Sequence, residues 1–194
     1  SIYITINQDK KYGLVSYAGS KILDNKYQKI YAIYGENYFV IDEDGKQVVI
    51  DSNDKKILTD GYDKITQINS DGVVFVKDKK YGFMDYEKNV VIKPEYQELE
   101  EINAGILKAK KDNKYGIINL KNKEKLAFKY SDLYYEQSAG FYVAEDEKYN
   151  SEILDIDFNV KLSGIISEIN KDSGYMKLKI GDEYKYYYFR FDEK

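Results

Sequence analysis

A short motif recurs along this chain at a nearly constant interval. Lys-Tyr-Gly occurs three times, and its tyrosine is Tyr12, Tyr81 or Tyr115. Fifteen residues after each of these motif tyrosines stands a second tyrosine, which opens a four-residue segment of the form Tyr-x-x-Ile/Leu. These signature tyrosines are Tyr27, Tyr96 and Tyr130, with a fourth, Tyr62, whose upstream position holds Gln47. The interval of 34 to 35 residues between successive motif positions predicts a repeat architecture.

Every copy of the repeat follows the same plan of short apolar runs separated by polar turns. The first run of each copy lies at residues 2–6, 38–41, 73–76, 106–109 and 141–144, and an Asp/Asn/Gly-rich turn joins it to the Tyr-Gly run. β-Branched and aromatic runs joined in this way are typical of β-hairpins. A third apolar run then leads into the signature tyrosine.

The repeat boundaries follow from this plan. We expect repeats at about residues 1–36, 37–71, 72–104, 105–139 and 140–173, and a partial repeat at 174–194, all within one repeat-array domain. The fifth copy is divergent, and we place its signature segment at residues 166–169, which requires a short insertion near residues 150–152. The predicted fold is all-β, with antiparallel hairpin repeats stacked in an elongated or curved array. A closed, propeller-like arrangement is the alternative, because propeller blades are also four short strands. Helical repeats of the same length are excluded, because the apolar runs are too short and are cut by turn residues.

The pattern resembles the bacterial WG (KWG) repeats, which carry Trp-Gly followed by a segment with proline and tyrosine. The third copy matches best, with Tyr81 and Gly82 at the Trp-Gly position and Pro94 and Tyr96 in the second segment. The chain departs from that pattern because it has no tryptophan and only one proline. The resemblance implies a β-rich array that mediates interactions, and it carries no family active site.

We expect the repeated tyrosines and glycines to be structural. Glycine weakens a strand, so a recurring glycine indicates a bulge or a side chain packed on bare backbone. We predict that the signature tyrosine of each copy covers this glycine and that both tyrosines are buried. The residues concerned are Tyr12, Gly13, Tyr81, Gly82, Tyr115, Gly116, Tyr27, Tyr62, Tyr96 and Tyr130.

Composition excludes several classes of function. The chain has 194 residues with no cysteine and no histidine, which rules out disulfides, zinc thiolate sites and the commonest general base. The formal net charge is −4 with both signs interspersed, which argues against a nucleic-acid partner. No apolar run is long enough to span a membrane. Residues 155–159 begin like a calcium loop, but Val160 and Ile166 replace its glycine and its final glutamate. We therefore expect no catalytic, cofactor or metal site.

Two groups of residues are candidates for binding a partner. Tyr17 and Tyr86 occupy matching positions in turns that vary between copies, so we expect them to be exposed. The second group lies in the aromatic carboxy-terminal run, where alternation places Tyr184, Tyr186, Tyr188 and Arg190 on one face. The hypothesis is a non-enzymatic module that binds a protein or a glycan, secreted or at the cell envelope. The alternatives are a structural spacer attached to a missing upstream domain and a carboxylate-dependent hydrolase.

Overall fold

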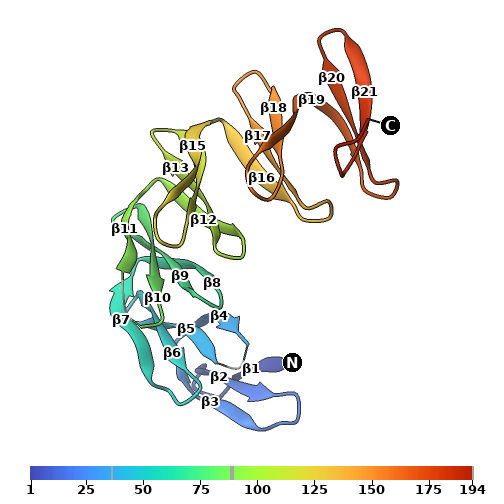
Figure 1. The fold of residues 1–194 in the computed structure, drawn as a ribbon. Helices are drawn as coiled ribbons and strands as arrows, with labels where there is room; N and C mark the ends of the chain where they lie inside the picture. Colours follow the sequence, from blue (N-terminus) through green and yellow to red (C-terminus); the bar gives the residue numbers. More distant parts are fainter. Residues whose placement is uncertain (36, 88–89, 194) are drawn as a thin grey trace. The chain divides into compact units, whose positions relative to one another are not determined.

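The chain consists of β-strands joined by turns. The computed structural model describes residues 1–35, 37–87 and 90–193, without the side chains of residues 59–61, and shows 21 strands there (Figure 1). These ranges contain no helix, and hence none that is long and apolar enough to cross a membrane. The prediction of an all-β fold built from tandem antiparallel repeats is confirmed. Strands and turns form two compact units, Ser1–Tyr96 and Gln97–Lys194.

The first unit contains three antiparallel sheets. The first sheet has three strands, β1 (Ile2–Ile6), β2 (Tyr12–Ser16) and β3 (Lys21–Tyr27). The second has four: β4 (Ile30–Tyr34), β5 (Tyr38–Glu43), β6 (Lys46–Asp51) and β7 (Lys56–Tyr62). The third also has four: β8 (Lys64–Ile68), β9 (Gly72–Lys77), β10 (Lys80–Asp85) and β11 (Val90–Tyr96).

The second unit contains a four-stranded sheet and a six-stranded sheet. The four-stranded sheet comprises β12 (Glu98–Asn103), β13 (Ile106–Lys111), β14 (Lys114–Asn119) and β15 (Glu124–Tyr130). The six-stranded sheet comprises β16 (Asp132–Glu136), β17 (Phe141–Glu145), β18 (Ser151–Leu154), β19 (Val160–Asn170), β20 (Tyr175–Ile180) and β21 (Glu183–Tyr188). The long strand β19 pairs with β18 through its first half and with β20 through its second half.

Each four-stranded sheet takes its outer strand from the end of the preceding sequence repeat. The strand that follows the signature tyrosine does not fold back on its own sheet but pairs with the first run of the next repeat, as β4 pairs with β5. The same holds for β8 with β9, β12 with β13 and β16 with β17. Sequence repeats and sheets are therefore offset by one strand.

The hairpin turns have the chemistry that the sequence predicts. Asp78 and Lys79 both adopt positive φ angles of 52° and 63°, and Asp112 and Asn113 do the same at 50° and 61°. Two central residues with positive φ define the turn whose twist matches a β-hairpin, and aspartate and asparagine tolerate this conformation.

The core of the first unit lies between successive sheets. Leu14, Leu23 and Tyr27 of the first sheet pack against Phe39, Ile41, Val48 and Ile50 of the second. The opposite face of the second sheet carries Val40, Val49, Leu58 and Tyr62, which pack against Ile65, Val73, Phe75 and Met84 of the third. Because side chains alternate between the faces of a strand, the middle sheet is buried on both sides.

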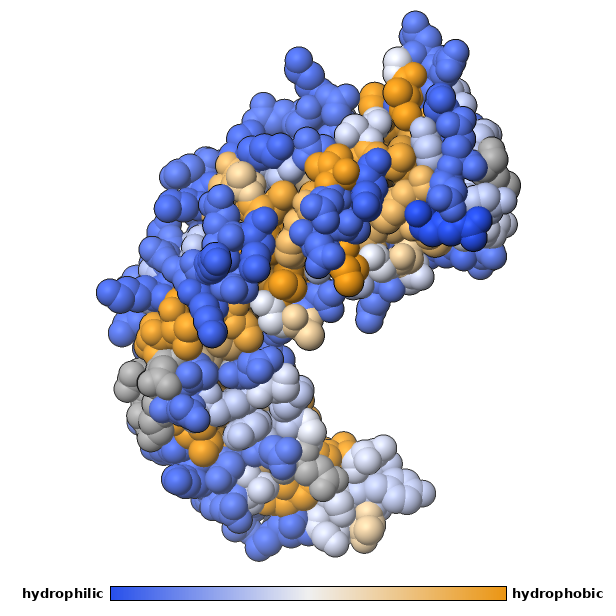
Figure 2. Space-filling model, viewed as in Figure 1, coloured by the Kyte–Doolittle hydropathy of each residue, from blue (hydrophilic) through white to orange (hydrophobic). Residues whose placement is uncertain are grey.

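The second unit repeats this arrangement. Ile117 and Tyr130 pack against Leu133, Tyr142, Ala144 and Leu154, and Phe141, Val143 and Ile153 pack against Met176, Leu178 and Tyr187. Figure 2 shows a mostly hydrophilic surface on which apolar residues gather in bands between hydrophilic ones.

A β-bulge recurs beside each Tyr-Gly pair and explains the glycine. In the third sheet Tyr81 pairs with Tyr96 and Phe83 pairs with Ile92, so two steps along β10 oppose four along β11. The extra residues press the backbone of β11 onto Gly82, where a Cβ atom would lie 2.6 Å from the Ile92 carbonyl oxygen. Gly13 and Gly116 meet the backbone of β3 and β15 in the same way, each with a closest distance of 2.7 Å. The glycine is therefore needed for close approach of two strands.

The two sets of tyrosines differ in burial. The signature tyrosines Tyr27, Tyr62, Tyr96 and Tyr130 are buried, whereas the motif tyrosines Tyr12, Tyr81 and Tyr115 are half-buried. The prediction that a signature tyrosine covers each glycine is wrong, because the nearest atoms belong to the bulged strand and, for Gly82 and Gly116, also to Phe75 and Phe128. The tyrosines instead pair side by side across the two strands, as Tyr12 does with Tyr27 and Tyr115 with Tyr130.

Candidate functional site

The fifth copy breaks the pattern of the other four. The position where other copies pair a motif residue with a signature tyrosine is taken by Ser151 on β18 and Gly164 on β19. The bulge beside the motif position is also missing, because the two strands keep step from the Ser151–Gly164 pair to the Ile153–Leu162 pair and shift register only beyond Ile153. The expected signature at residues 166–169 is out of register, since Ile166 pairs with Leu178 and so takes the aliphatic position. Two large side chains and a bulge are thus absent from one place in the fold.

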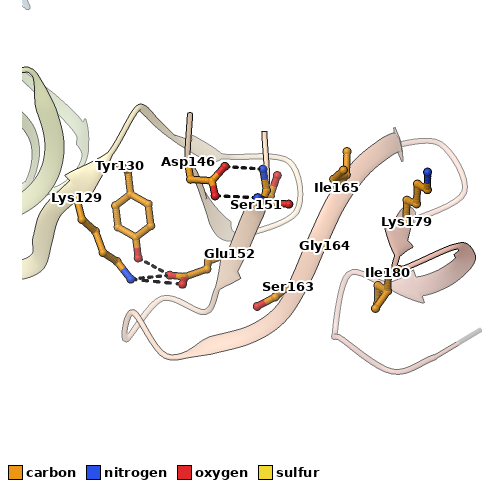
Figure 3. Close-up of a pocket in the computed structure, with 12 residues that line it drawn as sticks. Lys129, Tyr130, Asp146, Ser151, Glu152, Ser163, Gly164, Ile165, Lys179 and Ile180 are labelled. Atoms are coloured by element: carbon orange, nitrogen blue, oxygen red, sulfur yellow. Dashed lines mark hydrogen bonds and ion pairs between the residues drawn. The ribbon is translucent and has the colours of Figure 1, made fainter. Parts of the chain in front are cut away.

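A glutamate stands in this copy where the others carry glycine or valine. Glu152 follows Ser151 on β18, so its side chain points to the preceding sheet. There it accepts a hydrogen bond from the Tyr130 hydroxyl, and the Lys129 ammonium lies 3.4 Å from both carboxylate oxygens (Figure 3). Loss of the bulge leaves room for this side chain. The result is a group of three polar residues where the first strand pair of the fifth copy meets the preceding sheet.

The electrostatics of this group favour a charged lysine and a neutral tyrosine. Burial raises the pKa of Tyr130, and the hydrogen bond to Glu152 raises it further. The pKa of Lys129 is raised above its ordinary value, chiefly by its hydrogen bond to Tyr130. At neutral pH, Tyr130 therefore stays a hydrogen-bond donor and holds the carboxylate in place.

A pocket of about 640 Å³ opens beside this group. Lys129, Tyr130 and Glu152 line one side of it, and Ile165, Lys179 and Ile180 lie across from them on β19 and β20 (Figure 3). Ser163 and Gly164 also line the pocket, and Gly164 stands where the other copies carry the signature tyrosine. The pocket thus combines two carboxylates, two ammonium groups, three hydroxyl groups and two exposed isoleucines.

The rim of the pocket includes a closed polar turn at residues 146–150. The Asp146 carboxylate accepts hydrogen bonds from the backbone N–H groups of Lys148 and Asn150, at 2.8 and 2.9 Å, and from the Asn150 side chain at 2.8 Å. These bonds, led by the Asn150 amide, hold the pKa of Asp146 below its ordinary value. The Asp146 carboxylate is therefore ionised near neutral pH and is held within the turn by these hydrogen bonds.

Tyr17 and Tyr86 do not form the expected pair of exposed rings. Tyr17 is 78% exposed, whereas Tyr86 is half-buried and stacks on Tyr38 with the ring centroids 3.9 Å apart. The Tyr86 hydroxyl also donates to the Asn69 carbonyl at 2.6 Å, and burial raises its pKa. The difference arises because Tyr86 packs on the preceding sheet, while Tyr17 lies in the first sheet.

The carboxy-terminal tyrosines Tyr184, Tyr186 and Tyr188 alternate along β21 and so share one face, but they differ in exposure. Tyr184 and Tyr186 are exposed, and the Lys177 ammonium lies 4.5 Å from the first ring centroid and 5.5 Å from the second. Tyr188 is half-buried, and the Arg190 guanidinium lies over its ring at 5.1 Å. The other face carries Tyr187, which is buried in the core. The face that carries Tyr184, Tyr186 and Tyr188 therefore presents aromatic rings that already contact the cations of Lys177 and Arg190.

Sequence reasoning missed Glu152 and its pocket. The signal in the sequence is that the fifth copy has neither the motif tyrosine nor the signature tyrosine. In the sequence alone, this divergence is explained equally well by an insertion near residues 150–152, so the loss of side-chain volume goes unnoticed. Among the described residues, no group of three or more aspartates and glutamates lies close enough together to hold a metal ion.

A comparison with known families finds a match over part of the chain. The family model described as "WG containing repeat" matches residues 81–115, which supports a WG-repeat protein. The matched segment runs from one motif tyrosine to the next. No curated protein matches the chain.

The solved structures to which this chain is similar are distant in sequence. The chain is similar to Kluyveromyces lactis Hsv2p at 9% identity and a TM-score of 0.52, covering 97% of this chain and 71% of that one. A second structure of Kluyveromyces lactis Hsv2 gives 10% identity and a TM-score of 0.48 over 97% and 77% of the two chains. The Neurospora crassa Pan2 WD40 domain gives 13% identity and a TM-score of 0.40 over 91% and 68%. The first of these supports a β-repeat fold and nothing more.

Proposed function

We propose that this chain is a non-enzymatic repeat module that binds a protein or glycan ligand, and that the pocket of the fifth copy takes a polyhydroxylated, glycan-type group. The observation that carries the proposal is the local loss of two tyrosines and a bulge, which opens about 640 Å³ around Glu152. This volume lies within the usual range for small-ligand sites, about 300–1,000 Å³. A purely packing role would have kept the bulky residues of the other copies.

The donors and acceptors of the pocket suit hydroxyl groups. A sugar hydroxyl both donates and accepts, so it can bond at once to a carboxylate and to an ammonium group. Glu152 and Lys129 supply such a pair, which Tyr130 fixes in place. Lys179 and Ser163 add further polar groups, while the exposed side chain of Ile165 offers an apolar surface to the C–H face of a sugar ring.

Binding is favoured here over carboxylate-dependent hydrolysis. Glycoside hydrolysis needs two carboxyl groups, one of which is protonated and acts as the acid. The second acidic residue of the pocket is Asp146, whose hydrogen bonds lower its pKa and hold it in the turn. Asp146 is therefore a poor proton donor near neutral pH.

The family match guides two further parts of the proposal. Tyr81 stands where WG repeats carry tryptophan, so we take the chain as a Tyr-Gly variant of the bacterial repeats. A module of this kind would act outside the cell or at the cell envelope, where glycans are presented. A spacer does not need a pocket, so we rank the spacer hypothesis below ligand binding.

The test compares two serine-to-tryptophan variants on strand β19. Ser163 lines the pocket, so Ser163→Trp fills it, whereas Ser167 is also exposed on β19 but lies outside the pocket. We expect wild type and Ser167→Trp to bind the same members of an array of neutral and acidic oligosaccharides, and Ser163→Trp to lose that binding. Equal binding by all three proteins, or no binding to any oligosaccharide, would contradict the proposal.

A further inference from the structure

The turn on the rim of the pocket, residues 146–150, belongs to a type that recurs along the chain. Two backbone hydrogen bonds close it: Tyr149 N–H donates to the Asp146 carbonyl at 3.1 Å, and Asp146 N–H donates to the Asn150 carbonyl at 2.9 Å. The fourth residue of the turn adopts the left-handed conformation, with a φ of 63° at Tyr149. Turns with the same two bonds begin at Asn7, Ser16, Asp51, Asn119, Asp146, Asp155 and Tyr188.

The fourth residue of most of these turns either tolerates the left-handed conformation or is packed in it. Glycine, aspartate and asparagine adopt positive φ most readily, and they occur here as Gly19, Asp54 and Asn122. Phe158 is aromatic, and its ring packs 4.9 Å from that of Tyr142. Phe191 is also aromatic, and its ring lies 6.2 Å from that of Phe141. Lys10 is exposed, but its flexible side chain ends in a charge that water solvates.

Tyr149 is held in this conformation although its ring is not packed. The side chain is 73% exposed, and among the described residues it forms no hydrogen bond and no contact with another ring or a cation. A bulky residue with positive φ is unusual, and strain of this kind clusters at ligand sites. The fold therefore presents a large aromatic ring to solvent at a cost in backbone strain.

This turn is fixed in place beside the pocket. Asp146 and Asn150, which lie on either side of Tyr149 in the turn, both line the pocket (Figure 3). The Asp146 carboxylate accepts hydrogen bonds from backbone N–H groups of the turn, and Glu147 forms an ion pair with Lys114 of the preceding sheet. The backbone that carries Tyr149 is therefore ordered before any ligand binds.

We propose that Tyr149 recognises the sugar ring of the ligand, by stacking its aromatic face on the C–H face of a pyranose whose hydroxyl groups enter the pocket toward Glu152 and Lys129. This inference rests on the function proposed above. A tyrosine ring supplies a large apolar surface with only two side-chain torsions to fix, and the turn already fixes the backbone. Little conformational entropy is therefore lost when the ring binds.

The first test compares affinity with stability. The probe is the oligosaccharide that the whole chain binds most strongly on the array. We expect Tyr149→Asn to bind it at least about tenfold more weakly, and Tyr149→Phe, which keeps the ring, to bind nearly as well as wild type. The thermal midpoint of Tyr149→Asn should rise by about 4–8 °C, because asparagine tolerates positive φ. The matched variant Phe158→Asn should lower the midpoint, because the Phe158 ring is packed.

The second test reports where the sugar ring lies. The chain has no tryptophan, so Tyr149→Trp introduces a single fluorescent indole at the rim of the pocket. We expect the probe to shift its emission to shorter wavelength and to protect it from quenching by acrylamide. The control is Lys10→Trp, at the same turn position in the first copy, whose emission should not change.

Three outcomes would overturn the inference while leaving the pocket, which Ser163→Trp tests, as the ligand site. They are equal binding by Tyr149→Asn and wild type, a midpoint that falls in Tyr149→Asn as in Phe158→Asn, and an unchanged Tyr149→Trp emission at saturating probe. Absence of binding to every oligosaccharide would overturn both this inference and the proposed function.

Discussion

Replacing Gly82 by alanine tests whether the recurring glycine is required by close strand approach. A Cβ atom there would lie 2.6 Å from the Ile92 carbonyl oxygen and 2.7 Å from Cζ of Phe75, where ordinary contacts begin at 3.4 Å. The strands must therefore separate by several tenths of an ångström. Ile92 is fully buried, so moving its backbone also disturbs the core between β10 and β11. Overpacking of this kind costs about 1–3 kcal/mol, and we expect the upper half of that range because backbone must move.

The measurement is urea unfolding followed by circular dichroism, with the thermal midpoint as a second readout. For a unit the size of Ser1–Tyr96, each 1 kcal/mol lowers the midpoint by about 4–8 °C, so a loss of about 2–3 kcal/mol in Gly82→Ala should lower it by about 8–24 °C. The double variant Gly82→Ala with Phe75→Leu should recover only part of the loss, because the contact with the Ile92 carbonyl remains.

A matched glycine separates packing from backbone strain. Gly181 has a φ of +62°, and no atom lies within 4 Å of the position that an alanine Cβ would take, so Gly181→Ala suffers backbone strain but no clash. The strain amounts to about 1–2 kcal/mol, less the entropy gained by restricting the unfolded chain. We therefore expect Gly82→Ala to cost more than Gly181→Ala. The reverse order, or a change below about 0.5 kcal/mol at Gly82, would refute the reasoning.

Two further predictions concern tyrosine hydroxyls. The Tyr27 hydroxyl is buried with no hydrogen-bond partner among the described residues, so Tyr27→Phe should leave the free energy of unfolding unchanged or raise it by up to about 1 kcal/mol. Tyr130→Phe should instead lower the free energy of unfolding by about 1 kcal/mol, because it removes a hydrogen-bond donor from Glu152. Urea unfolding checks both, and equal effects would contradict the assigned hydrogen bond. The Tyr115 hydroxyl donates a hydrogen bond to the Glu98 carboxylate at 2.7 Å and holds the pKa of that carboxyl below its ordinary value. This hydrogen bond therefore stabilises the folded protein at pH values above the ordinary pKa of glutamate, and the stabilisation is lost as the pH falls through the lowered pKa of the folded state. The thermal midpoint should therefore fall less steeply between about pH 5 and pH 3 in Glu98→Gln than in wild type.

The strands and turns of this protein could be predicted because the repeat shows each of them several times. Apolar runs and Asp/Asn turns in register fix where hairpins lie, and residues such as Asp78 and Asp112 carry that information locally. The pairing between repeats could not be predicted in the same way. β4 pairs with β5 of the next repeat, and Ile30 of β4 lies in one buried cluster with Leu23 of the first sheet and Phe39 of the second, so the pattern within a single repeat does not decide which sheet β4 joins.

The candidate site was harder to find because its signal is a loss. Ser151 and Gly164 are unremarkable residues, and their meaning appears only when strand pairing places them where two tyrosines stand elsewhere. Glu152 is one of 34 acidic residues, and its position against Tyr130 depends on the absence of a bulge. The exposure of Tyr17 could be predicted, but the burial of Tyr86 depends on Tyr38 in another repeat.

The offset between sequence repeats and sheets bears on how such a chain can change in length. Duplicating one repeat inserts three strands for its own sheet and a fourth for the sheet that follows, so each new copy arrives as a complete four-stranded sheet. Repeat number can therefore change by whole sheets, without leaving the inserted sheet short of its outer strand.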